Sequence, residues 1–96
     1  MSKNLHTPEM DRLMDALLSL GNRGEAYSFM EDLCTVGELE AMQQRFEVAS
    51  MLREKNTYSE IAEKTGASTA TISRVNRSLM YGDDGYELVL KRLEEK

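Results

Sequence analysis

The sequence predicts an all-α protein of about six helices, and two observations carry that prediction. Apolar residues recur three and four positions apart along most of the chain, which is the spacing of one face of a helix. No segment shows the strict alternation of polar and apolar residues that marks a half-buried strand. Caps and glycine turns separate the apolar stretches, so residues 1–96 are expected to form one domain built from short helices.

The first two expected helices lie in residues 7–56, the part of the chain that we expect to form a helical core and a dimerisation region. Thr7 caps the first helix, and Pro8 takes its first position, where the missing N–H is not needed. The turn Gly-Asn-Arg-Gly at 21–24 leads into the second helix. Both helices have an apolar face, made of Met10, Leu13, Met14, Leu17 and Leu18 in the first and of Tyr27, Phe29, Met30 and Leu33 in the second.

The third expected helix is the longest. Thr35 and Glu38 have the spacing of a capping box at its start, and the helix continues to about Arg53. Its apolar face consists of Leu39, Met42, Phe46, Ala49 and Leu52, flanked by Val48 and Met51. The apolar faces of these helices exceed what a single helix pair can cover. We therefore expect part of this surface to be buried between two copies of the chain.

Residues 57–80 have the layout of a helix-turn-helix. Thr57 and Glu60 form a second capping box, which starts a short helix. Gly66 follows where the chain must turn, at a position that favours φ > 0 and a residue without a Cβ. Ser68 then caps the second helix of the motif. Small and apolar residues fit the inner side of the two helices and the turn: Ile61, Ala62, Ala67, Ile72, Val75 and Leu79.

The outer face of the second helix of this motif is suited to double-stranded DNA. No Asp or Glu occurs between Ser68 and Gly82, whereas a surface helix selected for solubility alone normally mixes charge signs. A helix in the major groove cannot place acids against phosphate, and it reads base edges with Arg and short polar side chains. The expected DNA-binding residues are Ser68, Thr69, Ala70, Thr71, Ser73, Arg74 and Arg77. A plain helical hairpin with a glycine turn is the alternative.

Residues 84–95 are expected to form a C-terminal helix after the turn Gly-Asp-Asp-Gly at 82–85. The side chains of Asp84 and Glu87 can cap this helix. Its apolar face consists of Tyr86, Val89, Leu90 and Leu93.

The net charge of −5 is unevenly distributed, which reconciles it with DNA binding. Residues 53–80 hold five Lys or Arg against three Asp or Glu, a net charge of +2. Residues 1–52 carry −5, and residues 81–96 carry −2. Because salt screens charges beyond about 10 Å, phosphate responds to the nearby face more than to the whole chain. The acidic remainder predicts weak non-specific binding that depends steeply on salt.

The chain has few of the residues that catalytic and metal sites use. It has one cysteine, Cys34, and one histidine, His6, which lies in the polar leader. No nucleophile–base set, phosphate-binding loop or metal-ligand cluster is present, so we expect no enzyme activity, catalytic residue, metal or cofactor. No apolar run approaches the roughly 20 residues of a membrane span, and the scarcity of cysteine is typical of a cytoplasmic protein. A helical adaptor that binds a partner helix, without binding DNA, is the alternative function.

From Asp32 to about Leu79 the sequence resembles the Trp-repressor family, in particular a repressor-like bacterial branch of it. The matching residues are Leu33-Cys34-Thr35, Glu38-Leu39-Glu40-Ala41, Arg45, Leu52, Glu60-Ile61 and the run from Gly66 to Arg74. The resemblance implies a six-helix chain that forms an intertwined homodimer. It also implies a sequence-specific transcription regulator, by expectation a repressor, that places the second helix of the motif, its recognition helix, in the major groove.

The resemblance also implies where a small-molecule effector would bind. In tryptophan-responsive members, the ligand packs between an arginine of the long helix and one of the recognition helix. On the recognition helix, Arg74 and Ser78 match. On the long helix, Arg45 is the closest match, and a one-residue length difference leaves Gln44 as an alternative. Glycine follows the recognition-helix arginine in those members, whereas Val75 stands here, and we expect its isopropyl group to enter the ligand space and disfavour tryptophan.

Overall fold

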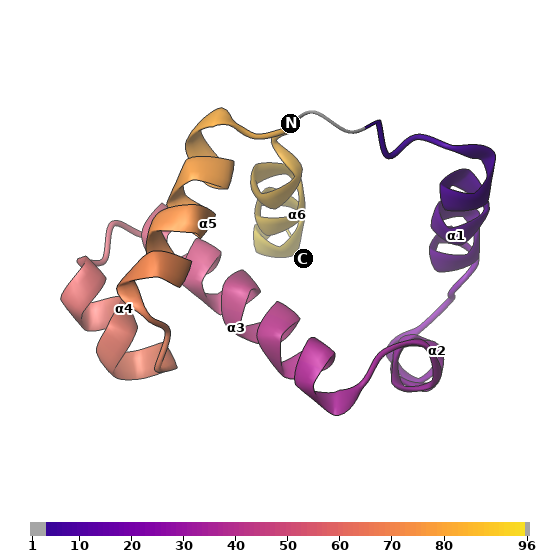
Figure 1. Ribbon diagram of the computed structural model, residues 1–96, viewed down its shortest axis with the longest axis horizontal. Helices are drawn as coiled ribbons and strands as arrows, with labels where there is room; N and C mark the ends of the chain where they lie inside the picture. Colours follow the sequence, from indigo (N-terminus) through magenta and orange to yellow (C-terminus); the bar gives the residue numbers. More distant parts are fainter. Residues whose placement is uncertain (1–3, 96) are drawn as a thin grey trace. The chain divides into compact units, whose positions relative to one another are not determined.

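The computed structural model describes residues 4–95, and in this range it contains six α-helices and no strand. Figure 1 shows them coloured along the chain. The helices are α1 (Pro8–Leu18), α2 (Arg23–Leu33), α3 (Val36–Arg53), α4 (Tyr58–Thr65), α5 (Thr69–Tyr81) and α6 (Gly85–Glu94). The predicted all-α fold with six helices is confirmed for the described residues. None of the described helices is both long enough and apolar enough to cross a membrane.

The chain divides into two compact units, Met1–Val36 and Gly37–Lys96. The first unit contains α1 and α2, and no residue of either helix is buried. Thr7 Oγ1 accepts the Met10 N–H (3.1 Å), which confirms the predicted cap of α1. Large apolar side chains of the two helices are exposed, namely those of Met14, Leu18, Tyr27 and Leu33. Within one chain, the predicted apolar faces of this unit therefore form no core.

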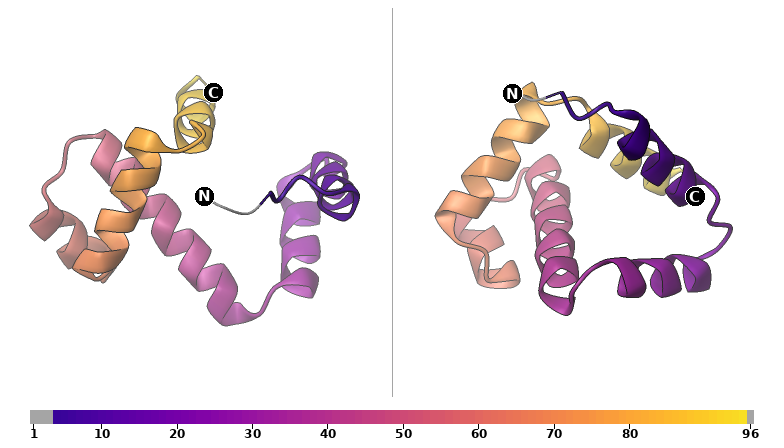
Figure 2. Two further views of the ribbon diagram at one scale, coloured as in Figure 1. Left: turned by 45° about the horizontal axis from the view of Figure 1, so that its top comes forward. Right: turned by 45° about the vertical axis from the view of Figure 1, so that its right-hand side comes forward.

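The core lies in the second unit and brings together residues of α3, α4, α5 and α6. Among the described residues, the buried apolar ones are Val48, Ala49, Met51, Ile61, Ala67, Ile72, Val75 and Leu90. The partly buried residues packed against them are Phe46, Leu52, Ala62 and Tyr86. Burying one Val, Leu or Ile side chain contributes roughly 1.5–3 kcal/mol, so this cluster supplies most of the burial that holds the four helices together. In Figures 1 and 2, α4 and α5 lie next to α3 in every view.

The buried side of α3 is rotated from the apolar face that the sequence predicts. Val48 and Met51, predicted only to flank that face, are buried. Leu39 and Met42, predicted to lie on it, are half-buried. On α6, Leu90 is the buried member of the predicted face. The second unit therefore also keeps apolar surface that one chain does not cover.

The helix-turn-helix forms as predicted, and the caps and the turn that define it are made by residues close together in the chain. Thr57 and Glu60 make a capping box, in which the Glu60 N–H donates to Thr57 Oγ1 (3.1 Å) and the Thr57 N–H donates to Glu60 Oε1 (2.7 Å). Gly66 ends α4 with φ = 75°, a left-handed conformation that favours glycine. Ala67 is buried in the turn. Ser68 Oγ accepts a backbone N–H of the first turn of α5 (3.1 Å), which confirms the second predicted cap.

An ion-pair network attaches α6 to the end of α3. The Arg53 guanidinium donates from Nε to Glu87 Oε1 (2.8 Å) and from Nη2 to Glu87 Oε2 (2.9 Å), and its Nη1 pairs with Glu94. The prediction that Asp84 and Glu87 cap α6 is wrong. Asp84 is the N-cap residue with φ = 64°, but its side chain makes no cap hydrogen bond, and Glu87 is engaged by Arg53. The hydrogen bonds from Arg53 hold the pKa of Glu87 below its usual range.

This pair makes the attachment of α6 dependent on pH. Because folding lowers the pKa of Glu87, the pair stabilises the folded protein above the unfolded value of about 4.3, and that contribution is lost as the pH falls through the folded value. We expect Glu87→Gln to lower Tm at pH 7 by a small amount, since both partners are partly exposed. Once the pH has fallen below the folded pKa of Glu87, we expect the variant and the wild type to have the same Tm. Thermal unfolding across this range measures the difference, with Glu40→Gln at an exposed position of α3 as the control. An effect of Glu87→Gln that is as large in acid as at neutral pH would contradict this assignment.

Candidate nucleic-acid interface

The exposed side of α5 carries the residues predicted to bind DNA. Ile72 and Val75 are buried, which turns the opposite side of the helix outward. The exposed members of the predicted set are Ser68, Thr69, Ala70, Ser73, Arg74 and Arg77. Thr71 is half-buried. Positions 69, 73 and 77 and positions 70 and 74 are four apart, so these side chains form one continuous face.

The two arginines of this face are not engaged by the protein. Glu87 and Glu94 pair with Arg53, and not with an arginine of α5. Neither Arg74 nor Arg77 has a hydrogen-bond or ion-pair partner among the described residues. A guanidinium without a carboxylate partner is available to phosphate oxygens and to the edge of guanine, and its fork of donors matches both. The face is therefore positively charged and presents free hydrogen-bond donors.

Ser68 differs from the rest of the predicted set, because its hydroxyl is already used within the protein. Its Oγ accepts the Thr71 N–H (3.1 Å) and donates to Thr71 Oγ1 (3.2 Å). These two bonds fix the first turn of α5 and the side chain of Thr71. The contribution of Ser68 to this face is therefore to position the start of the helix.

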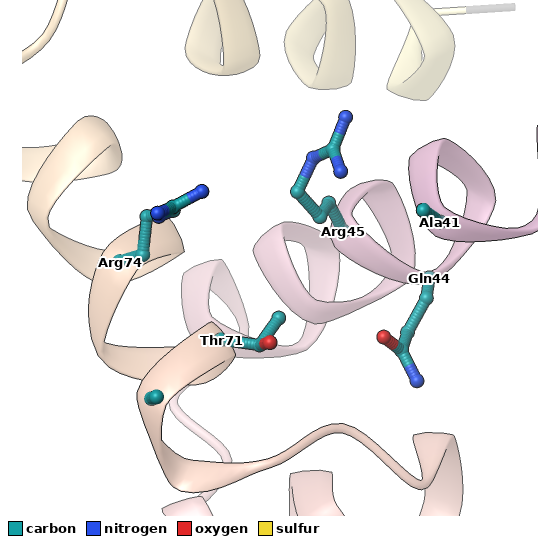
Figure 3. Close-up of a pocket in the computed structure, with 6 residues that line it drawn as sticks. Ala41, Gln44, Arg45, Thr71 and Arg74 are labelled. Carbon is teal, nitrogen blue, oxygen red and sulfur yellow. The ribbon is translucent and has the colours of Figure 1, made fainter. Parts of the chain in front are cut away.

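A pocket of about 280 Å³ lies between α3 and α5. It is lined by Ala41, Gln44, Arg45, Ala70, Thr71 and Arg74. Figure 3 shows Arg45 on α3 and Arg74 on α5 at the pocket, with Thr71 between the two helices. No acid lines the pocket, and two guanidinium groups and a hydroxyl do, so it is suited to an anionic group. The structure thus brings together Arg45 and Arg74, the pair predicted to hold an effector.

Ala41 lines the pocket although the sequence did not indicate it, and Gln44 and Arg45 both line it although the sequence offered them as alternatives. The spacing of the three residues could have placed them together, because positions i, i+3 and i+4 share one face of a helix. Both Gln44 and Arg45 line the pocket, but their side chains point in opposite directions in Figure 3.

Two other residues discussed for the effector site lie elsewhere. Ser78 lines a different, more open hollow with Phe46 and Tyr86, about one turn further along α5. Val75 is 1% exposed and belongs to the core, and it does not line the pocket. The expectation that its isopropyl group enters the ligand space is therefore wrong. Val75 follows Ile72 by three positions, which places it on the inner stripe of α5 and turns it away from the pocket.

Known proteins share this chain's sequence and fold over nearly its whole length. The family described as Trp repressor protein matches residues 8–94. The uncharacterized protein YerC of Bacillus subtilis (strain 168) is 54% identical over 91 residues, which cover 95% of this chain and 88% of YerC. The crystal structure of a TrpR-like protein from Eubacterium eligens ATCC 27750 is 61% identical, with a TM-score of 0.91 and coverage of 94% of this chain and 93% of that one. A crystal structure from Staphylococcus aureus is 48% identical, with a TM-score of 0.91 and coverage of 96% and 92%. The chain therefore belongs to the Trp repressor family, a family of DNA-binding regulators.

Proposed function

We propose that this protein is a sequence-specific DNA-binding transcriptional regulator, a repressor, that places α5 in the major groove of double-stranded DNA. The observation that carries the proposal is the exposed, acid-free face of α5 with the unengaged guanidinium groups of Arg74 and Arg77. Membership of a DNA-binding family supports it. Thr69 and Ser73 add short polar side chains of the kind that contact base edges, and Ser68 acts through the cap of the helix. A regulator of this kind acts where the chromosome lies, so we propose a cytoplasmic location.

We propose further that the protein binds DNA as a homodimer. The helices α1 and α2 bury no residue, and they expose large apolar side chains such as Leu18, Tyr27 and Leu33. Apolar surface of this kind marks an interface more often than a free surface. Two copies of the chain would also present two recognition helices, which is how helix-turn-helix proteins read two half-sites. In this proposal, residues 7–56 supply most of the contact between the copies.

In vitro selection of duplexes from a random pool tests the function and the assembly together. We expect one near-palindromic sequence to be enriched, with half-sites about one helical turn apart. Light scattering at micromolar protein concentration should report a dimer. Binding to the selected duplex should also fall steeply with salt, whereas a scrambled duplex of the same composition binds weakly.

Two outcomes would contradict these proposals separately. A pool that stays random, with no salt-dependent retention on a DNA column, would favour the helical adaptor over the regulator. A monomer at high protein concentration would contradict the dimer.

The pocket between Arg45 and Arg74 is the proposed effector site. Two guanidinium groups with no described partner favour a small molecule that carries an acidic group. Arg74 belongs to this pocket and to the DNA-facing side of α5, so a bound molecule would change the affinity for DNA. Because Val75 lies in the core, its side chain gives no ground for excluding tryptophan. Measuring the affinity for the selected duplex with and without L-tryptophan tests this part, and the role of Ser78 remains a prediction.

A further inference from the structure

A hydrogen bond from α3 holds the turn of the helix-turn-helix. Gln44 Nε2 donates to the backbone carbonyl of Thr65 (3.1 Å), 21 residues further along the chain. The bond is partly buried. The direction of the amide follows from chemistry, because only its nitrogen can donate to a carbonyl oxygen. Figure 3 shows the Gln44 side chain directed away from Arg45, toward the segment that joins α4 and α5.

The carbonyl that Gln44 binds is one that α4 cannot satisfy by itself. Thr65 is the last residue of α4, and the last four carbonyls of a helix have no intrahelical donor. The last backbone hydrogen bond of α4 runs from the Gly66 N–H to the carbonyl of Ala62 (2.9 Å), so it does not satisfy the carbonyl of Thr65. Gln44 therefore supplies, from another helix, a donor that the end of α4 lacks.

The side chain of Thr65 adds two local bonds at the same point. Its Oγ1 donates to the carbonyl of Ile61 (2.7 Å) and accepts the Ala67 N–H (3.1 Å). These bonds set the backbone from Thr65 to Ala67 relative to α4, but they cannot set it relative to α3. Of these three bonds, the one from Gln44 sets the turn relative to α3.

The position of this turn sets the position of α5. Ala67 is buried directly after it, and Ser68, the cap of α5, comes next. A small displacement of the turn would therefore move the first residues of the recognition helix, where a helix-turn-helix contacts base edges. Arg74 and Thr71, which lie across the same pocket from Gln44, belong to the proposed DNA-binding face.

We propose that Gln44 is a positioning residue for DNA recognition, which fixes the turn between α4 and α5 against α3 and thereby aims α5 at the base edges. This inference rests on the proposed DNA-binding function. Gln44 itself does not contact DNA in this proposal, and its action passes through the Thr65 carbonyl.

The test replaces Gln44 with methionine, which keeps the length of the side chain and removes the donor. The matched control is Gln43→Met, at the exposed neighbouring position of α3. In the free protein, we expect the amide protons of Gly66 and Ala67 to exchange about 3- to 10-fold faster in Gln44→Met, the change that loss of one hydrogen bond produces. We expect the affinity for the selected duplex to fall by a similar factor, with an unchanged salt slope, because no charge is removed. Circular dichroism establishes that both variants keep their helices, and Gln43→Met should match the wild type in both measurements.

Each other outcome overturns the proposal in a recognisable way. Unchanged exchange with weaker DNA binding would make Gln44 a direct DNA contact. Faster exchange with wild-type affinity would mean that the bond stabilises the turn but has no role in DNA recognition. If the wild-type protein binds no duplex, the proposed function fails and the role in DNA recognition falls with it. The exchange measurement needs no DNA, and it still reports whether the bond fixes the turn.

Discussion

Replacing both Arg74 and Arg77 with alanine is expected to lower the affinity for the selected duplex by on the order of 100-fold or more. Each arginine that contacts a base or a phosphate contributes about 1–3 kcal/mol, and the two lie one turn apart on the exposed face of α5. Neither guanidinium has a partner within the described protein, so the fold should be unaffected. Fluorescence anisotropy at several salt concentrations measures the affinity and its salt slope.

The single variants separate two kinds of contact. If Arg74→Ala or Arg77→Ala alters the selected sequence, that arginine reads a base. If it only reduces the salt slope by about one, it neutralises a phosphate. For Lys64→Ala on α4 we expect a smaller loss of affinity than for either arginine variant.

A matched control removes the same charge from other parts of the molecule. Arg12→Ala combined with Arg92→Ala takes two exposed cations from α1 and α6. This variant should lose less affinity than the double α5 variant, because neither arginine belongs to the proposed DNA-binding face. Wild-type binding by the double α5 variant, or an equal loss in the control, would contradict the assignment of α5 as the recognition helix.

The parts of this fold that the sequence predicts well are those fixed by neighbours in the chain. The capping box of Thr57 and Glu60, the left-handed Gly66 and the Ser68 cap each involve residues within three or four positions of one another. Their geometry follows from backbone hydrogen bonds that must be satisfied locally. The helix-turn-helix could therefore be predicted before any tertiary contact was known.

The parts that could not be predicted depend on contacts between distant residues. Glu87 has the spacing of a helix-capping residue, yet it pairs with Arg53, which lies 34 residues earlier in the chain. The bond from Gln44 to Thr65 spans 21 residues. No local pattern distinguishes a glutamine or a glutamate that makes such a bond from one that faces solvent. The partner is set by how the helices pack, which the sequence pattern does not specify.

Val75 shows how two sequence arguments can disagree about one residue. Its spacing from Ile72 and Leu79 places it on the inner stripe of α5, whereas the resemblance to tryptophan-responsive proteins placed it in the ligand space. The structure agrees with the spacing, since Val75 is packed in the core. A comparison with glycine at the same position says only that volume has been added. It does not say whether that volume fills the pocket or the core.

We expect Val75→Gly to lower the free energy of unfolding by about 3 kcal/mol. The change removes three buried carbons at about 0.8 kcal/mol each, leaves a cavity, and puts the poorer helix former into α5 at a further cost of about 0.5 kcal/mol. This is a large fraction of the 5–15 kcal/mol typical of a natural domain. Val75→Ala should lie between this variant and the wild type. Urea unfolding at one fixed protein concentration measures the differences, since the stability of a dimer depends on concentration.

The matched control is Ser73→Gly, two positions earlier on the exposed side of the same helix. It introduces glycine without removing a buried side chain, so it should lower the free energy of unfolding by only about 0.5 kcal/mol. The difference between the two variants then measures the packing of Val75 against the core. If Val75→Gly destabilises the protein no more than Ser73→Gly does, Val75 is not a core residue in solution. Its isopropyl group would then be free to occupy the ligand space, and the argument against tryptophan binding would stand again.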